Sequence, residues 1–264
     1  MKEAEWDPPP EPELPPGAEF SSPTGRLIAA WEHGGGDIKA VRKQYDPLPH
    51  WPGGKSGLTI GMGYDLRYQS GTKLRKDFGN VLTPAEIAKL DAYTPQINAK
   101  GKQVPPQKKA SKAAVTATAD VEVRYKDAVK VFEDTVLPRY QEEAYNTFPG
   151  LKDMDPYTQA AVVSMVYNRG SSIPKKTKKK KQPLRRTHFL EIKEAVVKKD
   201  ILAIAATLRK MKAEHTKKST KAGLRRRRES EAKMIEDNYT AAQYWYYGQR
   251  NVTPEPAGTV MGPR

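Results

Sequence analysis

The chain has 264 residues, a formal net charge of +15 and a hydrophobic content of 37%, with 22 prolines and 19 glycines. Its length suits one substantial domain with tails, and the absence of cysteine excludes disulfides, thiolate metal sites and a cysteine nucleophile. No apolar run approaches the roughly 18–20 residues of a membrane-spanning helix, and the four histidines lack the spacing of a metal site.

The two ends of the chain differ in composition from the middle. Residues 1–24 contain six prolines between residues 8 and 16, and six acidic side chains against one lysine, which predicts an extended tail or linker outside the fold. We expect residues 25–248 to form one domain with a basic loop insertion at 171–187, and residues 249–264 to form a second tail. The N-terminus lacks the basic start and apolar stretch of a secretory signal, so we expect any export to use another route.

The first part of the domain predicts a helix and then a small β region. Residues 26–33 are good helix formers and end at three glycines, which are a helix C-terminal signal. Residues 46–63 hold three prolines and five glycines around the apolar run 58–60, which predicts a hairpin or turn-rich sheet. Thr83 followed by Pro84 and Glu86 has the pattern of a capping box, so a helix should begin there.

The rest of the domain predicts mostly helices. Residues 95–118 are rich in lysine and proline and predict a loop. Apolar side chains then recur at three-to-four-residue spacing from Tyr125 to Ala144, which predicts a long helix that Pro138 kinks or divides. Residues 155–170 predict a largely buried central helix. Further helices are expected at residues 188–199, 201–213 and 221–237.

Positive charge is concentrated between Lys175 and Arg186, where eight of twelve residues are basic. This composition predicts a solvated loop, with polyanion binding as the alternative. The net charge of the whole chain likewise attracts polyanions, although charge alone does not say which ones.

Two carboxylates from separate segments point to hydrolysis of a glycosidic bond. That reaction needs one group to protonate the leaving oxygen and a second polar centre to direct water or stabilise the positive sugar. Glu32 lies at the predicted end of the first helix, and Asp65 follows the predicted hairpin. Thr59 lies among glycines that would let a sugar approach the backbone closely. Glu32, Asp65 and Thr59 are therefore the candidate catalytic residues.

These segments resemble the phage-type lysozymes, which have a catalytic glutamate at the end of the first helix and then a hairpin with a Thr-Ile-Gly-x-Gly run. The resemblance is closer to the pesticin-like branch, in which the aspartate follows the threonine by six residues, as Asp65 follows Thr59 here. In the commoner phage branch the aspartate precedes the threonine by six residues. That position here is Gly53, so the departure favours Asp65.

Two later segments extend the resemblance to about residues 25–237. Residues 166–170 resemble the aromatic-Asn-Arg-Gly end of the family's central helix, and residues 223–232 resemble its closing helix. The resemblance implies an α+β, mainly α, lysozyme-like fold of two lobes, a small β-hairpin lobe and a helical lobe, with the substrate cleft between them. The substrate contacts that it implies are Gly61, Tyr64, Asn168 and Arg169.

The implied enzyme is an N-acetylmuramidase, which cleaves the β-1,4 bond between N-acetylmuramic acid and N-acetylglucosamine in peptidoglycan and so lyses bacterial cell walls. Glu32 would donate the proton, and Asp65 with Thr59 would position the attacking water. Such a pair gives inversion if the carboxyl groups lie about 6.5–9.5 Å apart. No metal or organic cofactor is implied.

The expected partners are peptidoglycan and, through the basic loop, anionic wall polymers. The absence of a known nucleic-acid reading motif argues against nucleic acid. We expect action in the periplasm or cell wall after delivery by phage lysis machinery, a virion or a secretion system, and a toxin would have an immunity protein as a further partner. The rival hypothesis is a polyanion-binding or virion structural protein whose lysozyme-like domain is inactive.

Each residue of interest also has a structural interpretation. Thr59 could be an ordinary strand residue, because threonine favours strands. Asp65 could cap the next helix, and residues 168–169 could form a helix C-terminal cap. We expect the arginines at 225–228 to form a structural, solvated face of a helix rather than part of a site. The aromatic run at 244–247 predicts packing of the last helix against the core.

Overall fold

The computed structural model describes residues 17–54, 56–173, 187–215 and 220–242, which form a mainly helical structure with two short hairpins. The predicted α+β, mainly α class is therefore confirmed. The antiparallel strand pairs are β1 (Thr59–Ile60) with β2 (Tyr64–Asp65), and β3 (Gln96–Ile97) with β4 (Gln103–Val104). The helices are α1 (Pro23–His33), α2 (Ile38–Gln44), α3 (Gly71–Phe78), α4 (Pro84–Asp91), α5 (Lys112–Ala117), α6 (Tyr125–Val131), α7 (Leu137–Thr147), α8 (Pro156–Arg169), α9 (Thr187–Lys198), α10 (Ile201–Lys210) and α11 (Thr220–Asp237).

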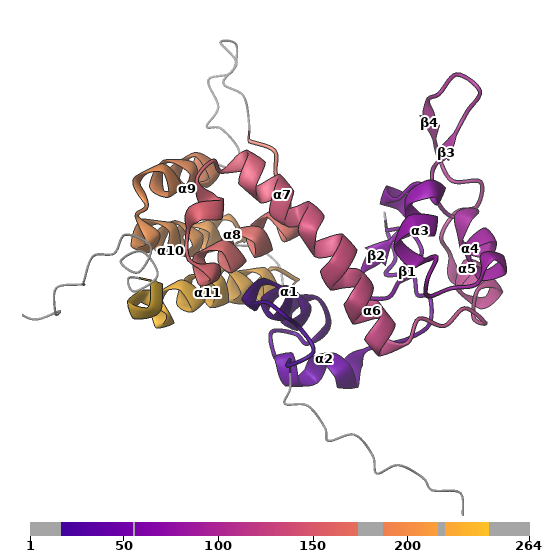
Figure 1. Ribbon diagram of the computed structural model, residues 1–264, viewed down its shortest axis with the longest axis horizontal. Coiled ribbons are helices and arrows are strands. Elements are labelled where there is room, and N and C mark those ends of the chain that lie inside the picture. Colours follow the sequence, from indigo (N-terminus) through magenta and orange to yellow (C-terminus); the bar gives the residue numbers. More distant parts are fainter. Residues whose placement is uncertain (1–16, 55, 174–186, 216–219, 243–264) are drawn as a thin grey trace, which may run out of the picture.

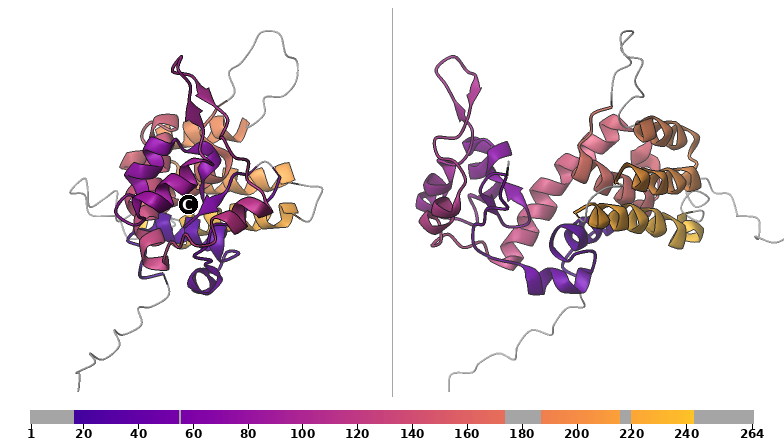
Figure 2. Two further views of the ribbon diagram at one scale, coloured as in Figure 1. Left: turned by 90° about the vertical axis from the view of Figure 1, so that its right-hand side faces the viewer. Right: turned by 180° about the vertical axis from the view of Figure 1, so that it is seen from behind.

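The elements gather into two groups, as Figures 1 and 2 show. Both hairpins and helices α3, α4 and α5 form the smaller group, whereas α8 to α11 form the larger one. Helices α6 and α7 run as one long rod from the smaller group to the larger (Figure 1). Helix α1 packs against α2 and α8, and α11 packs against α8 and α10. Segments distant in sequence are thus brought together around the end of α1.

Helix α8 lies at the centre of the larger group, as its sequence predicts. The Asp155 carboxylate caps it by accepting the N–H groups of Tyr157 at 3.0 Å and Thr158 at 2.9 Å. The run 160–166 is entirely buried, and α8 contacts α1, α7 and α11. A polar side chain within that run, Ser164, therefore needs a hydrogen-bond partner inside the protein.

The long rod is divided where its sequence predicts a break. Between α6 and α7 the backbone forms a π-helical segment, Phe132–Val136, and Pro138 lies in the first turn of α7. Proline has no N–H to donate to the preceding turn, and its ring crowds the carbonyl four residues earlier. The widened π turn accommodates that loss while the rod continues to the larger group.

Two predictions about loops and tails were wrong. Phe20, which we placed in an excluded tail, is fully buried and packs edge-on against Phe132 at 6.3 Å between ring centroids. Ser22 caps α1 by accepting the N–H of Gly25 at 3.0 Å, so the fold begins before residue 25. The predicted loop at 95–118 contains the β3–β4 hairpin and helix α5. Residues 174–186 of the predicted basic loop insertion (171–187) and the aromatic run at 244–247 lie outside the described residues.

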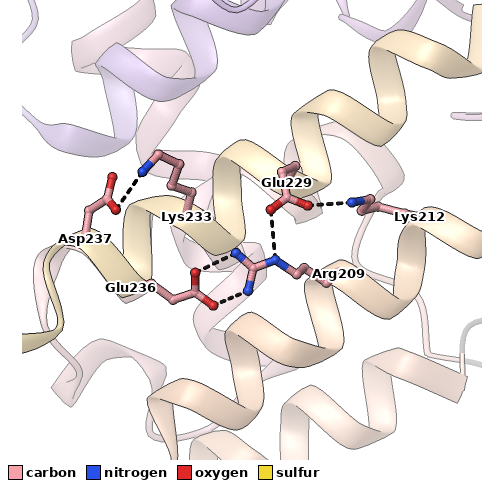
Figure 3. A network of polar contacts seen from close by, with 6 residues as sticks. All are labelled: Arg209, Lys212, Glu229, Lys233, Glu236 and Asp237. Carbon is pink, nitrogen blue, oxygen red and sulfur yellow. Dashed lines mark hydrogen bonds and ion pairs between the residues drawn. The ribbon is translucent and has the colours of Figure 1, made fainter.

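Helices α10 and α11 are joined by a group of ion pairs centred on Arg209 (Figure 3). Its guanidinium contacts both carboxylate oxygens of Glu236 and donates from Nε to Glu229 at 2.8 Å. Lys212 contacts the other oxygen of Glu229. These side chains are about one-third exposed, so water screens the pairs and their main effect is to fix how the two helices align.

Among the described residues, no helix combines the length and the apolar character needed to cross a bilayer.

Candidate active site

Glu32 lies in the last turn of α1, as predicted. The helix ends at Gly34, and the N–H of Gly36 returns to the carbonyl of Ala30 at 2.8 Å. Gly36 has φ +104°, and a Cβ built on it would lie 3.0 Å from the ring of Trp31. The positive φ and the close indole favour glycine at this turn, where the chain reverses. The Glu32 side chain is about one-third exposed.

Arg227 of α11 holds the Glu32 carboxylate. Its Nη1 donates to Glu32 Oε1, while the guanidinium itself is only 4% exposed. Within the described part of the chain, no residue bonds to the other oxygen, Oε2. Glu32 is therefore fixed through one oxygen and presents the second to its surroundings.

The prediction that the arginines at 225–228 form a solvated face was wrong for two of them. Arg227 and Arg228 are 3% and 0% exposed, and both point inward from α11. Arg227 donates from Nε and Nη2 to the Ser164 hydroxyl at 3.2 and 3.1 Å, which satisfies the buried polar group of α8. Ser164 and Arg228 each bond to the fully buried Glu231 at 2.7 Å. This buried network connects α8 and α11 to the end of α1.

The β1–β2 hairpin places Thr59 directly opposite Asp65. Asp65 Oδ1 accepts the N–H groups of Gly57 at 3.0 Å and Arg67 at 2.9 Å, so the carboxylate also caps the short 3₁₀ turn that follows. A Cβ on Gly57 would lie 2.3 Å from Asp65 Oδ1, so only glycine allows this approach. The capping role suggested by the sequence is thus present, and it fixes the orientation of the carboxylate.

Thr59 is held through both its backbone and its side chain. It is 4% exposed, and its hydroxyl lies 3.4 Å from the carbonyl of Gly57. Its backbone exchanges two hydrogen bonds with His50, at 2.8 and 2.9 Å. His50 thus pairs with the outer edge of β1, so that at this point three chain segments lie side by side. These contacts limit the movement of Thr59 relative to Asp65.

The turn of the hairpin meets the ends of α1 and α8. A Cβ built on Gly63, at φ +73°, would lie 3.5 Å from the Tyr167 hydroxyl and 4.0 Å from His33 Nε2. The residue after Glu32 and the end of the central helix are therefore both adjacent to the hairpin that carries Asp65. A larger residue at Gly63 would fill the space between them.

Two tyrosines lie close to the candidate catalytic carboxylates. Burial raises the pKa of Tyr140 above its usual value; the charge of Glu143 adds to this and that of Arg139 opposes it, while Glu32 and Asp65 raise it to a smaller extent. Burial raises the pKa of Tyr167 as well, with a contribution from Glu32. The two rings lie 4.4 Å apart between centroids.

His33, which follows Glu32, is partly buried. Burial lowers its pKa below the usual value, the charge of Glu32 raises it, and the charge of His50 lowers it further. Its Nε2 is buried and has no hydrogen-bond partner within the described residues. Within the described residues, Arg227 is the cation that contacts Glu32 directly.

Two of the predicted substrate contacts do not face the site. Gly61 is buried, and a Cβ there would meet core side chains. Tyr64 is 3% exposed and donates its hydroxyl to Asp77 at 2.8 Å, so it supports the hairpin from behind. Both residues therefore face the core of the protein, and their assignment as substrate contacts stays a prediction. Asn168 and Arg169 are half-buried in the last turn of α8, directly after Tyr167.

The sequence interpretation missed Arg227, Tyr140 and Tyr167. Arg227 lies on α11 three residues after Leu224 and eight before Ile235, so its spacing places it on the apolar side of the helix. Tyr167 is part of the segment that resembles the family's central helix. No signal in the sequence marks Tyr140, because its relation to Glu32 depends on the packing of α7 against α8.

Comparison with known families matches residues 28–210 to a family described as a domain of unknown function (DUF8812). The match covers more than half of the chain, and the protein belongs to this family. The matched span includes Glu32, the β1–β2 hairpin and α8, and it ends before α11. Comparisons with curated proteins and with solved structures gave no match.

Proposed function

We propose that the protein is a peptidoglycan hydrolase of the N-acetylmuramidase type. The observation that carries this proposal is the meeting of the Glu32 end of α1, the Asp65 hairpin and the Tyr167 end of α8 around Gly63. Two carboxylates on separate elements flanking one region are the requirement for protonating a leaving group and directing water. The order of these elements also agrees with the lysozyme resemblance of the sequence.

Glu32 is the general acid in this proposal. Arg227 orients it through Oε1, and Oε2 bears the proton for the glycosidic oxygen. The buried network behind Arg227 keeps the guanidinium in place, since Ser164 bonds to it at two positions. Such support from behind limits the movement of the acid, and catalytic geometry tolerates little movement.

Asp65 directs the attacking water. The N–H groups of Gly57 and Arg67 hold it in one orientation, and carboxylate oxygens have lone pairs left over for a water molecule. Thr59, directly opposite in the hairpin, fixes the strand from which Asp65 projects.

In this proposal the two groups of elements are the lobes of a lysozyme-like fold, and the glycan strand lies between them. The enzyme acts in the bacterial periplasm or cell wall, and it reaches that compartment by phage lysis machinery, a virion or a secretion system. Its positive charge favours contact with anionic wall polymers.

Replacing Glu32 with glutamine tests the proposal. The amide keeps an oxygen that accepts the hydrogen bond from Arg227, so the fold should persist, but it cannot act as a proton donor of the required acidity. We expect lysis of purified walls, followed as loss of turbidity, to fall by about a hundredfold or more. Glu194→Gln on the exposed surface of α9 is the matched control and should lyse walls like the wild type.

Normal lysis by folded Glu32→Gln protein would contradict the assignment of the acid. A gel-shift assay on the same proteins addresses the rival function. Retention of DNA with no lysis by the wild type would favour a polyanion-binding protein over a muramidase.

A further inference from the structure

A hollow of about 630 Å³ lies beside the Asp65 hairpin and is not accounted for by the proposed hydrolysis. One wall is formed by Gly57, Arg67 and Tyr68, and the other by Tyr93 and the segment that follows β4. The volume falls within the range of about 300–1,000 Å³ that is typical of small-ligand sites. The hollow is therefore large enough for a short peptide or a sugar.

The base of the β3–β4 hairpin gives this hollow a fixed wall. The N–H of Lys108 donates to the carbonyl of Ala92 at 2.9 Å, which ties the returning chain to the end of α4. The ammonium of Lys108 lies over the Tyr93 ring at 5.9 Å. This contact places a cation and an aromatic surface side by side.

The chemistry of the lining favours a ligand with both carboxylates and apolar groups. Arg67, Lys108 and Lys109 supply positive charge, and none of the lining residues is acidic. Tyr68 is 67% exposed, and the guanidinium of Arg67 lies 6.0 Å from its ring. Aromatic rings beside cations, in a lining without acidic residues, are suited to binding a partner that carries negative charge.

The hollow and the Asp65 site share one wall. The N–H groups of Gly57 and Arg67 bond to the Asp65 carboxylate, and the same two residues line the hollow. A ligand in the hollow would thus lie next to a glycan strand held at Asp65. In peptidoglycan the group found next to the glycan is the stem peptide, which is attached to muramic acid and carries free carboxylates.

We propose that this hollow binds the stem peptide of peptidoglycan and selects glycan strands that carry it. This proposal rests on the proposed muramidase function for its biological meaning, but binding of the peptide can be measured without hydrolysis. Arg67, Lys108 and Lys109 pair with the stem carboxylates, and Tyr68 and Tyr93 contact its apolar groups. The β3–β4 hairpin thereby sets substrate choice without taking part in bond cleavage.

The first experiment measures binding of a free tetrapeptide stem to the whole protein by calorimetry. We compare the wild type with Lys108→Gln/Lys109→Gln, and use Lys100→Gln/Lys102→Gln as the control. The control lysines are exposed near the turn of the same hairpin and do not line the hollow, so both variants lose the same charge. Loss of charge-assisted contacts predicts an affinity lower by on the order of tenfold for the first variant alone.

The second experiment compares hydrolysis of glycan strands with and without their stem peptides. The Lys108/Lys109 variant should lose about tenfold more kcat/KM on stem-bearing strands than on stripped strands, whereas the control variant should lose the same on both. If the wild type cleaves neither substrate, the muramidase proposal fails, and the binding experiment alone decides the role of the hollow.

Three results would overturn the stem-peptide site. The first is an absence of peptide binding to the wild type, and the second is an equal loss of binding in both double-lysine variants. The third is displacement of the bound peptide by inorganic phosphate at equal concentration, which would show a general anion site. Weaker binding of a stem peptide with amidated carboxylates would support the proposed ion pairs.

Discussion

Replacing Arg227 with methionine should lower the stability of the fold as well as its activity. The guanidinium is almost fully buried and bonds to Ser164 and Glu32. Removing one partner of a buried ion pair costs about 3–5 kcal/mol. Here the loss is smaller, because water reaches Glu32 and Arg228 still pairs with Glu231.

These considerations give an expected loss of about 2–3 kcal/mol in the free energy of unfolding, or about 4–12 °C in Tm. The assay is urea unfolding followed by circular dichroism at neutral pH. Arg226→Met is the matched control, since it removes the same charge from the preceding residue of α11, which is exposed. This variant should change the free energy of unfolding by no more than about 0.5 kcal/mol. Equal stability of the two variants would refute the structural role of the buried network.

The remaining predictions concern the second carboxylate, pH and salt. Asp65→Asn should reduce wall lysis nearly as much as Glu32→Gln. Asp46→Asn should reduce lysis only slightly, because its amide oxygen still accepts the backbone N–H of Leu48. The opposite order of lysis rates would place the second carboxylate in the loop before Thr59. Because burial lowers the pKa of His33 in the fold from its usual 6.5, the unfolded chain takes up a proton first as pH falls. Stability should therefore decrease from about pH 7 to pH 5 and decrease less in a His33→Gln variant; equal slopes in urea-unfolding series would contradict this. Replacing the lysines from 175 to 181 with serine should slow the lysis of whole walls at low salt. The difference in lysis rate from the wild type should vanish near 1 M salt, where the Debye length is about 3 Å. A difference that does not vary with salt would mean that these lysines belong to the fold or the active site.

Local signals in the sequence predicted the elements that depend on local chemistry. The capping box at Thr83 and the Asp155-Pro156 start of α8 specify helix ends through bonds within a few residues, and both helices begin as predicted. The division of the long rod near Pro138 follows from the missing N–H of proline.

Elements with weak apolar patterns could not be predicted in the same way. The strands of the β3–β4 hairpin are two residues long, and a turn in which Asn98 bonds to Lys102 holds them, so no alternating pattern develops. Helix α3 is mostly polar and buries few side chains, including Leu74 and Phe78. Burial of these elements is decided by neighbours that lie far away in sequence.

The candidate site shows the same division. The helix end at Glu32 follows from glycine signals, whereas the pairing of Thr59 with Asp65 was not predicted, because the β region was expected to end at residue 63. The arginine run does not itself reveal which side chains point inward, because four consecutive residues cover every face of a helix. Only the packing of α11 against α8 selects Arg227 as the partner of Glu32.

The most direct test of the proposed mechanism is the mass of the fragments released from purified peptidoglycan. Hydrolysis with Glu32 as acid and water directed by Asp65 predicts muropeptides with N-acetylmuramic acid at the reducing end, and it predicts that folded Glu32→Gln protein releases them at least about a hundredfold more slowly. Fragments ending in N-acetylglucosamine, or in anhydro sugars formed without water, would contradict the account, as would the release of peptides alone.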